Sequence, residues 1–368
     1  MCHWPAGLPR SRWRLTDPDD SRAVTAATGP AARAVPSVSP GGSSVPVHPA
    51  LASRFPLLEG IDSFEAAFAD PALRARLDAY MATPADALQP PAVETREGAA
   101  PGPHGPVPVR VYLPEGDRIG RPCLVWLHGG AFRFGDLDMP EADWTARQVC
   151  ERAGAVVVSV DYRLAVDGVH FPVPHDDVAA AVRWVRDTAA DLGIDPARIS
   201  LGGASAGGNL AAGAALRLRD DDGWQPAALV LAYPATHPVP PAPSHSLAAK
   251  LAELPPVLVP TAQHPVFSEN YLGGPLSSAT GYAFPALGVL EGLAPTLVLN
   301  AEYDDLRASG EAFAAGCARA GVDVGQVMEP GMLHGFLNQP ADLEPVDDAL
   351  DQMAAVVTGA PARTAVRS

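Results

Sequence analysis

The chain of 368 residues contains 26 basic and 42 acidic residues, which gives a formal net charge of -16 at pH 7. A protein this acidic repels polyphosphates and anionic lipid headgroups, so no nucleic acid partner is expected. No segment reaches the roughly 18 uninterrupted apolar residues of a membrane span, and the N-terminus lacks the apolar core of a signal peptide. We therefore expect a globular cytoplasmic protein with no membrane span.

The first part of the chain contains two predicted regions. Residues 1–48 are rich in Pro, Ser, Gly, Ala and Thr and offer few large apolar side chains, which predicts a disordered tail. One domain is expected to follow over residues 49–368. Apolar residues recur at helical spacing over 61–81, which predicts two short helices with Asp62 and Asp70 as candidate N-caps.

A change of pattern marks the start of a sheet. AVETREG and VPVRVYLPEG alternate in polarity on either side of a Gly/Pro turn, which predicts an antiparallel pair of strands. Continuous apolar runs then alternate with helical segments, as in a mostly parallel sheet covered by helices on both faces. The runs are CLVWLHGG, AVVVSVDY, RISLGG, AALVLAYP, PTLVLNAEYD and DVGQVMEPG, and the helical segments are 140–153, 174–190, 206–219 and 307–320.

A long connection interrupts this alternation. About sixty residues separate LAYP from PTLVLN, where a few residues are usual. Ligands of such sheets bind at the carboxyl ends of the strands. We therefore expect residues 236–285, together with about 50–90, to form a helical cap over that edge and to shape a pocket for a small molecule.

The clearest candidate for chemistry is Ser205, which lies in Gly203-Ala204-Ser205-Ala206-Gly207. This G-x-S-x-G pattern stands directly between a predicted strand and a predicted helix, as in a nucleophile elbow. The elbow forces the serine into a strained backbone conformation, and side chains at the two glycines would crowd the turn. A flexible loop of small residues has the same composition, so the partners of the serine decide between the two interpretations.

A serine nucleophile needs a base, which follows it in the chain in proteins with this elbow. The histidines after Ser205 are His237, His245, His264 and His334. The first three fall in the proline-rich connection, whereas His334 follows the last predicted strand in EPGMLHGF. We therefore predict that His334 is the base.

The acid that orients the base is expected directly after the strand PTLVLN. The sequence there offers Glu302, Asp304 and Asp305. We prefer Asp304 as the acid and keep Asp305 as its main rival, since either aspartate could instead cap the following helix.

An oxyanion-binding loop completes the set. His128-Gly129-Gly130-Ala131 ends a predicted strand and matches the HGGG-type loop whose backbone amides stabilise a tetrahedral intermediate. A further amide is expected from Ala206, at the positive end of the helix after the nucleophile. For His128 we expect a structural role in ordering the turn.

The chain resembles the hormone-sensitive lipase family of α/β-hydrolase esterases over roughly residues 90 to 355. The motifs that carry the resemblance are HGGAF, VSVDYRLA, FPVPHDD, LGIDPARISLGGASAGGNLAA, AEYDDLR and HGF. It implies an α/β-hydrolase fold whose functional residues are the triad Ser205, Asp304 and His334 and the oxyanion donors Gly129, Gly130 and Ala206. Three departures from the family pattern are present: Ala204 stands where an acidic residue is usual, and Ala131 stands where a third glycine is usual. In the usual D-P-L-x-D pattern, Asp305 replaces the proline and Ala308 replaces the second acid.

The expected activity is hydrolysis of carboxylic esters with small to medium acyl groups through an acyl-enzyme intermediate. No phosphate-binding glycine loop or cluster of metal ligands is present in the sequence, so no cofactor or metal is expected. The alternatives are an amide or carbamate hydrolase, a deacetylase of a specialised metabolite, or a non-catalytic binding protein with the same fold. Both a monomer and a homodimer are compatible with the sequence.

Overall fold

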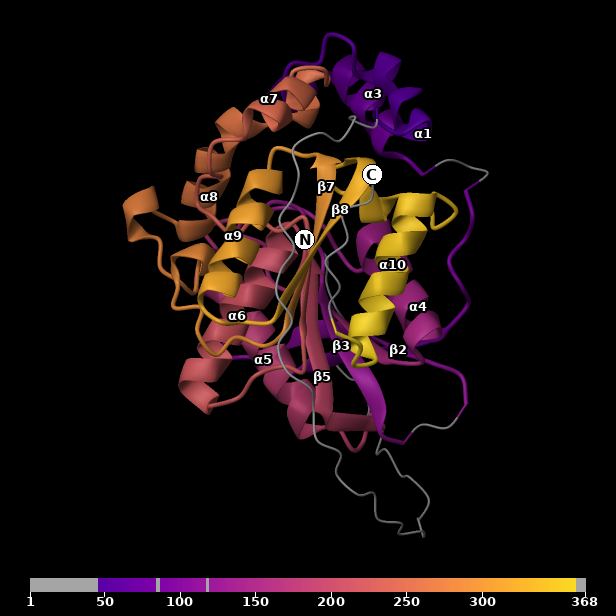
Figure 1. Cartoon of the computed structure of the whole chain (residues 1–368), viewed down its shortest axis with the longest axis vertical. Helices are drawn as coiled ribbons and strands as arrows, with labels where there is room; N and C mark the ends of the chain where they lie inside the picture. Colours follow the sequence, from indigo (N-terminus) through magenta and orange to yellow (C-terminus); the bar gives the residue numbers. More distant parts are fainter. Residues whose placement is uncertain (1–45, 84–86, 117–118, 362–368) are drawn as a thin grey trace. The chain divides into compact units, whose positions relative to one another are not determined.

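The computed structural model of the chain describes residues 46–83, 87–116 and 119–361, and within these ranges one eight-stranded sheet forms the centre (Figure 1). Its order is β1-β2-β4-β3-β5-β6-β7-β8; β2 pairs antiparallel with β1 and β4, and every other pair is parallel. The strands are β1 (Glu94–Ala100), β2 (Val107–Leu113), β3 (Arg121–Leu127), β4 (Val156–Val160), β5 (Ile194–Ala204), β6 (Leu229–Ala232), β7 (Thr296–Tyr303) and β8 (Val324–Leu333). The predicted antiparallel entry and mostly parallel sheet are confirmed.

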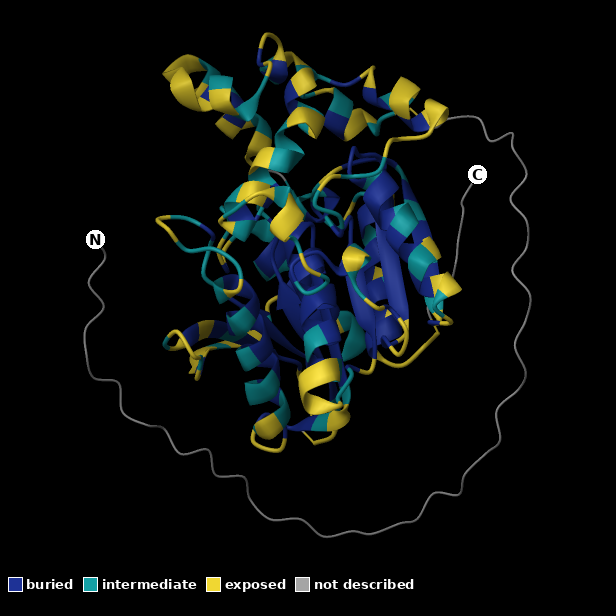
Figure 2. Ribbon diagram, turned by 90° about the vertical axis from the view of Figure 1, so that its left-hand side faces the viewer, coloured by how far each residue is buried: buried dark blue, intermediate teal, exposed yellow. Residues whose placement is uncertain are grey.

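Helices cover both faces of the sheet (Figure 1). One face packs against α4 (Pro140–Ala153) and α10 (Glu344–Val357), and the other against α5 (Val173–Asp187), α6 (Ala206–Asp222) and α9 (Arg307–Arg319). The inner strands β3, β4, β6 and β7 are almost entirely buried between these layers, whereas the edge strand β1 is mostly exposed (Figure 2). This double covering explains why the inner strands read as continuous apolar runs instead of alternating ones. In the described ranges, no helix combines the length and apolarity needed to cross a membrane.

The helix α10 has no counterpart among the predicted elements. Its apolar residues nevertheless recur at helical spacing, and Pro345 occupies its first turn, where proline is tolerated. The inward-facing side chains pack with α4 in one buried cluster. They include Val346, Leu350, Met353 and Val357. The periodicity was therefore sufficient to predict this helix.

Two groups of short helices lie near the carboxyl ends of β7 and β8; the first group and the start of the second are at the top of Figure 1, and the rest of the second group is at its left. The first group is α1 (Pro49–Ala52), η1 (Phe55–Leu58), α2 (Phe64–Ala69) and α3 (Pro71–Met81). The second group is α7 (His245–Leu251), η2 (Pro256–Leu258), η3 (Thr261–Gln263), α8 (His264–Leu272), η4 (Leu276–Ser278) and η5 (Pro285–Leu287). Val257 and Leu258 of the second group pack with the buried side chains of the first. These segments are called the cap below.

Two details of the N-terminal part differ from the predictions. The first is the N-cap of α2, which is Ser63 and not Asp62, because the Ser63 hydroxyl accepts the Ala66 amide. Asp70 caps α3 as expected. The predicted disordered tail lies outside the described residues up to residue 45. Its last three residues are ordered, since the amide of His48 donates to the carbonyl of Gly331 over 2.9 Å. The tail prediction is therefore wrong for residues 46–48.

The packing of α10 generates a stability prediction. Met353 is fully buried, so Met353→Ala removes apolar contacts and leaves a cavity in the core. We expect the free energy of unfolding to fall by about 2–4 kcal/mol in chemical denaturation. Gln352→Ala, one residue earlier on a partly exposed face, should change it by less than about 0.5 kcal/mol. Equal effects of the two substitutions would contradict the packing of this helix.

Candidate active site

Ser205 lies at the junction of β5 and α6 in a backbone conformation that is unusual for a residue with a side chain, with φ 53° and ψ -114°. The turn leaves no room beside it. A Cβ added at Gly203 would overlap the backbone of Gly207, and one added at Gly207 would overlap the carbonyl of Leu127. The two glycines are therefore a steric requirement of the turn, and the geometry is that of a nucleophile elbow.

His334 lies between Ser205 and Asp304. Its Nε2 is 3.0 Å from the Ser205 hydroxyl oxygen, and its Nδ1 is 2.8 Å from Oδ2 of Asp304. The carboxylate is fully buried, and its other oxygen accepts the amide of Leu306 over 2.8 Å. Because the carboxylate accepts from Nδ1–H, Nε2 is left free to accept a proton from the serine. The structure thus brings together the three residues that the sequence selected.

The other acidic side chains after β7 have different partners. Glu302 pairs with Lys250 over 2.6 Å and accepts the Gly331 amide with its second oxygen. Asp305 pairs with His264 over 2.8 Å. Neither Glu302 nor Asp305 makes a hydrogen bond with His334. Asp304 is therefore the acid that contacts the histidine.

Two opposing effects act on the pKa of His334. Burial favours the neutral imidazole, but the charge of Asp304 and its hydrogen bond favour the imidazolium, and Asp305 and Glu141 add to that field. The acidic neighbours win and raise the pKa of His334 from 6.5 to about 9.

The loop after β3 corrects one sequence prediction. The amide of Gly129, expected to be an oxyanion donor, instead donates to Oε1 of Glu141 over 2.7 Å. The carbonyl of Gly129 accepts from Nδ1 of His128 over 2.7 Å, which gives this histidine the structural role expected of it. In a trans peptide the N–H points away from the preceding C=O, so this bond directs the Gly130 amide to the opposite side.

The next peptide is fixed in the same way. The carbonyl of Gly130 accepts the amides of Arg133 and Phe134, both over 2.9 Å. The amide of Ala131 is therefore turned away from them, and Ala131 itself has a positive φ of 51°. No acceptor within the described residues is recorded for the Gly130 and Ala131 amides. Ala131 thus replaces Gly129 as a candidate donor.

The candidate donor on the other side of the serine is the amide of Ala206, the first residue of α6. The carbonyl of Ser205 accepts the amides of Asn209 and Ala235, at 3.1 and 3.2 Å, and this orients the Ser205–Ala206 peptide. The Ala206 amide also lies at the positive end of a helix of 17 residues. A developing negative charge near Ser205 would therefore be stabilised by both the amide and the helix.

Glu141 is a residue of this site that sequence reasoning missed. It lies in the first turn of α4 and is almost fully buried. Its Oε2 accepts the hydroxyl of Tyr233 over 2.6 Å and the Asn338 side-chain amide over 3.3 Å. Burial raises its pKa, and these donors oppose that effect. An acidic residue at a helix N-terminus is common, so the sequence carried no signal that separates this one from an ordinary helix start.

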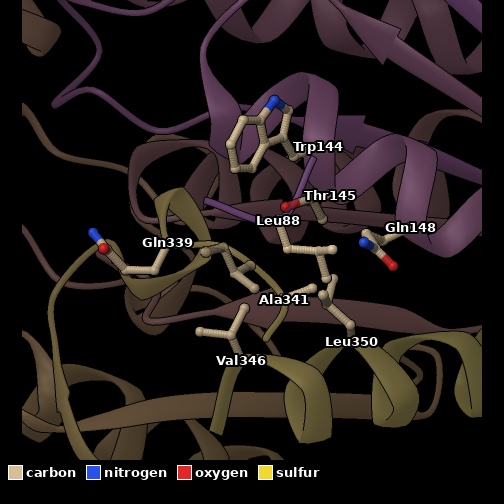
Figure 3. A pocket seen from close by; sticks show the side chains of 9 residues that line it. Leu88, Trp144, Thr145, Gln148, Gln339, Ala341, Val346 and Leu350 are labelled. Atoms are coloured by element: carbon tan, nitrogen blue, oxygen red, sulfur yellow. The ribbon is translucent and has the colours of Figure 1, made fainter. Parts of the chain in front are cut away.

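A small pocket of about 10 Å³ lies farther along α4, between this helix and α10 (Figure 3). Trp144, Thr145 and Gln148 line one side, and Val346 and Leu350 line the other. No residue of the triad lines it. It is therefore not the site at which an ester would meet Ser205.

Comparisons with known proteins identify relatives of this chain. The profile of a family described as having the alpha/beta hydrolase fold matches residues 124–338. The chain is 36% identical to a carboxylesterase, NlhH, of Mycobacterium tuberculosis over 310 residues, which cover 80% of this chain and 88% of that relative. It is 32% identical to an ethyl acetate hydrolase of Pseudomonas putida, covering 66% and 76% of the two chains. A solved structure of a hyperthermophilic esterase from the archaeon Pyrobaculum calidifontis superposes with a TM-score of 0.70 and 33% identity, covering 85% of this chain and 98% of that one.

Proposed function

Since this chain belongs to the α/β-hydrolase fold family and is a carboxylic ester hydrolase, we propose that Ser205, Asp304 and His334 form its catalytic triad. The observation that carries the proposal is the position of His334, whose two ring nitrogens lie 3.0 Å from the serine hydroxyl and 2.8 Å from the carboxylate. An ordinary structural histidine has no need of both partners, whereas a general base for a serine does.

The first half of the reaction forms an acyl-enzyme. The Ser205 oxygen attacks the ester carbonyl carbon while its proton passes to Nε2 of His334. Asp304 stabilises the imidazolium without taking the proton itself. The imidazolium then gives the proton to the leaving alkoxide, so that the alcohol departs and the acyl group stays on the serine. In the second half, His334 takes a proton from water while the water oxygen attacks the acyl carbon. The imidazolium then returns the proton to the Ser205 oxygen as the bond between the serine and the acyl group breaks and the carboxylic acid leaves.

Negative charge develops on the carbonyl oxygen in both halves. We assign its stabilisation to the amides of Gly130, Ala131 and Ala206. Each is held by hydrogen bonds to the carbonyl of its own peptide group, so the donors are oriented before the substrate arrives. Donors fixed in this way have no reorganisation to complete at the transition state.

The proposed substrates are esters with small to medium acyl groups, and the proposed branch of the family is that of hormone-sensitive lipase. Similarity to an ethyl acetate hydrolase supports small esters. The cap supports a bounded pocket, because Lys250 and His264 tie it to the carboxylates on either side of Asp304. The cytoplasmic location expected from the sequence also stays a prediction.

The first test replaces the nucleophile. Ser205→Ala removes the attacking oxygen, so turnover of p-nitrophenyl acetate and butyrate should fall by at least about 10⁴-fold. Labelling by a fluorophosphonate probe should disappear as well. Steady-state kinetics and gel detection of the label measure the two effects.

A matched control is available in the same strand. Ser200 is also buried in β5, and its hydroxyl makes no hydrogen bond with the described residues. Ser200→Ala should keep both hydrolysis and labelling. Normal turnover by the Ser205 variant would refute the proposed triad, whatever the control shows.

The second test follows the pKa of the base. His334 must be neutral to accept a proton, and its pKa is raised to about 9, so kcat/KM should fall as the pH falls below that value, by about tenfold per pH unit. Asp305→Asn removes one of the charges that raise this pKa. We therefore expect the acidic limb of the kcat/KM profile to move to lower pH in this variant.

The variant and the unmodified enzyme are compared by the pH at which the acidic limb lies, and not by the plateau value of kcat/KM. The plateau could also change because Asp305 contacts His264 and Thr261 of the cap. Asp191→Asn serves as the control, since Asp191 is an exposed carboxylate in the turn between α5 and β5. Its limb should coincide with that of the unmodified enzyme. A limb that does not move in Asp305→Asn would show that this carboxylate does not act on the base.

A further inference from the structure

We propose that Glu141 is a positioning residue for the reaction, which holds the oxyanion loop and the loop of the base in register with the nucleophile. The inference rests on the proposed function of Ser205 and His334. Glu141 touches neither the substrate nor the reacting atoms. Its effect is transmitted through the Gly129 amide on one side and through Tyr233 and Asn338 on the other.

The contact with Gly129 sets the direction of the donor amides. The peptide that joins His128 to Gly129 is held at both ends, since its N–H donates to Glu141 over 2.7 Å and its C=O accepts the hydroxyl of Tyr162 over 2.8 Å. The donors Gly130 and Ala131 follow directly along the chain. Rotation of this first peptide would turn the next ones, so the Glu141 oxygen fixes the starting plane of the oxyanion loop.

The second oxygen of Glu141 acts on the other side of the site. It accepts the hydroxyl of Tyr233, whose ring packs edge-on against the imidazole of His334 at 5.0 Å between centroids. It also accepts from Asn338, whose side-chain amide in addition donates to the carbonyl of Gly335, the residue after the base. One carboxylate therefore restrains both the face of the imidazole and the turn that carries it.

Glu141 approaches the elbow from α4. The position beside Ser205 in β5 itself carries no polar side chain. Ala204 ends β5 beside Ser205 with a fully buried methyl group. A Cβ placed on Gly129 would lie 3.2 Å from the Ala204 carbonyl oxygen, 3.2 Å from Cβ of Ser205, and against Oε1 of Glu141. The carboxylate is thus packed at the point where the oxyanion loop meets the nucleophile.

A purely structural role makes a different prediction from a positioning role. If Glu141 only stabilised the fold, its loss would lower the amount of active enzyme, and each remaining site would work normally. If it positions the donors, each intact site slows, and the loss appears in kcat more than in KM because the oxyanion exists only after attack has begun.

The experiment compares Glu141→Leu, which keeps the bulk but has no acceptor, with Glu141→Gln, which keeps one carbonyl oxygen for the Gly129 amide. Rates are taken on the alkaline plateau, so that a change in the pKa of His334 does not contribute, and are divided by the site concentration from fluorophosphonate titration. We expect kcat per site to fall by about 10²-fold in Glu141→Leu, the scale of one lost oxyanion donor. Glu141→Gln should lose less than about tenfold.

A trifluoromethyl ketone provides a second measurement. The Ser205 oxygen adds to the ketone carbon, the serine proton passes to His334, and the ketone oxygen becomes the oxyanion. The inhibition constant for this adduct should therefore rise in parallel with the loss of kcat/KM across the two variants. Thr145→Val, one turn farther along α4 and buried without a hydrogen bond within the described ranges, should change neither quantity.

The outcomes separate this inference from the proposed function. An unmodified enzyme that neither hydrolyses the esters nor takes the label refutes the triad. An active unmodified enzyme with normal kcat per site and normal ketone inhibition in Glu141→Leu overturns the role of Glu141 alone. Equal losses in the leucine and glutamine variants also overturn it, because the charge of Glu141 and not its acceptor for Gly129 would then be responsible.

Discussion

The strained backbone of Ser205 is the constraint on which the rest of the site depends. A serine at φ 53° and ψ -114° costs on the order of 1–3 kcal/mol, and this conformation persists only where its surroundings fix it. Here β5 lies in the interior of the sheet between β3 and β6, and the Ser205 amide donates to the carbonyl of Ala232 over 2.9 Å. The fold thus stabilises the turn through the sheet, and the projecting hydroxyl follows from the turn.

The proposed oxyanion donors are oriented through carbonyl groups. Each candidate amide is turned toward the site because the C=O of its peptide group is already bonded on the other side, by His128 for Gly130, by two loop amides for Ala131, and by α6 and Ala235 for Ala206. Planarity of the peptide then determines the direction of the N–H. The loop therefore needs no side chain to contact the substrate oxygen.

The parts of this arrangement that could be predicted from the sequence are those that depend on residues close together in the chain or on chain order. The strands, the elbow glycines and the order Ser205, Asp304, His334 depend on local pattern and chain order, so the sequence carries them. The choice between Asp304 and Asp305 depends on which side chain His264 binds from the cap, a contact between residues 41 positions apart in the chain. The loss of Gly129 as a donor depends on Glu141 in a helix beyond the loop, and no periodicity marks such a pairing.

The contacts of the cap and the proposed catalytic acid, Asp304, share one short segment of backbone. Glu302 lies at the end of β7, and Asp304 and Asp305 directly follow the strand. Glu302 and Asp305 pair with Lys250 and His264 of the cap, and Asp304 between them pairs with His334. The three acids thus differ in the segment that supplies their partner: Lys250 and His264 come from the cap, and His334 comes from the loop after β8. The two carboxylates that bind the cap and the one that binds His334 therefore lie on the same segment of backbone.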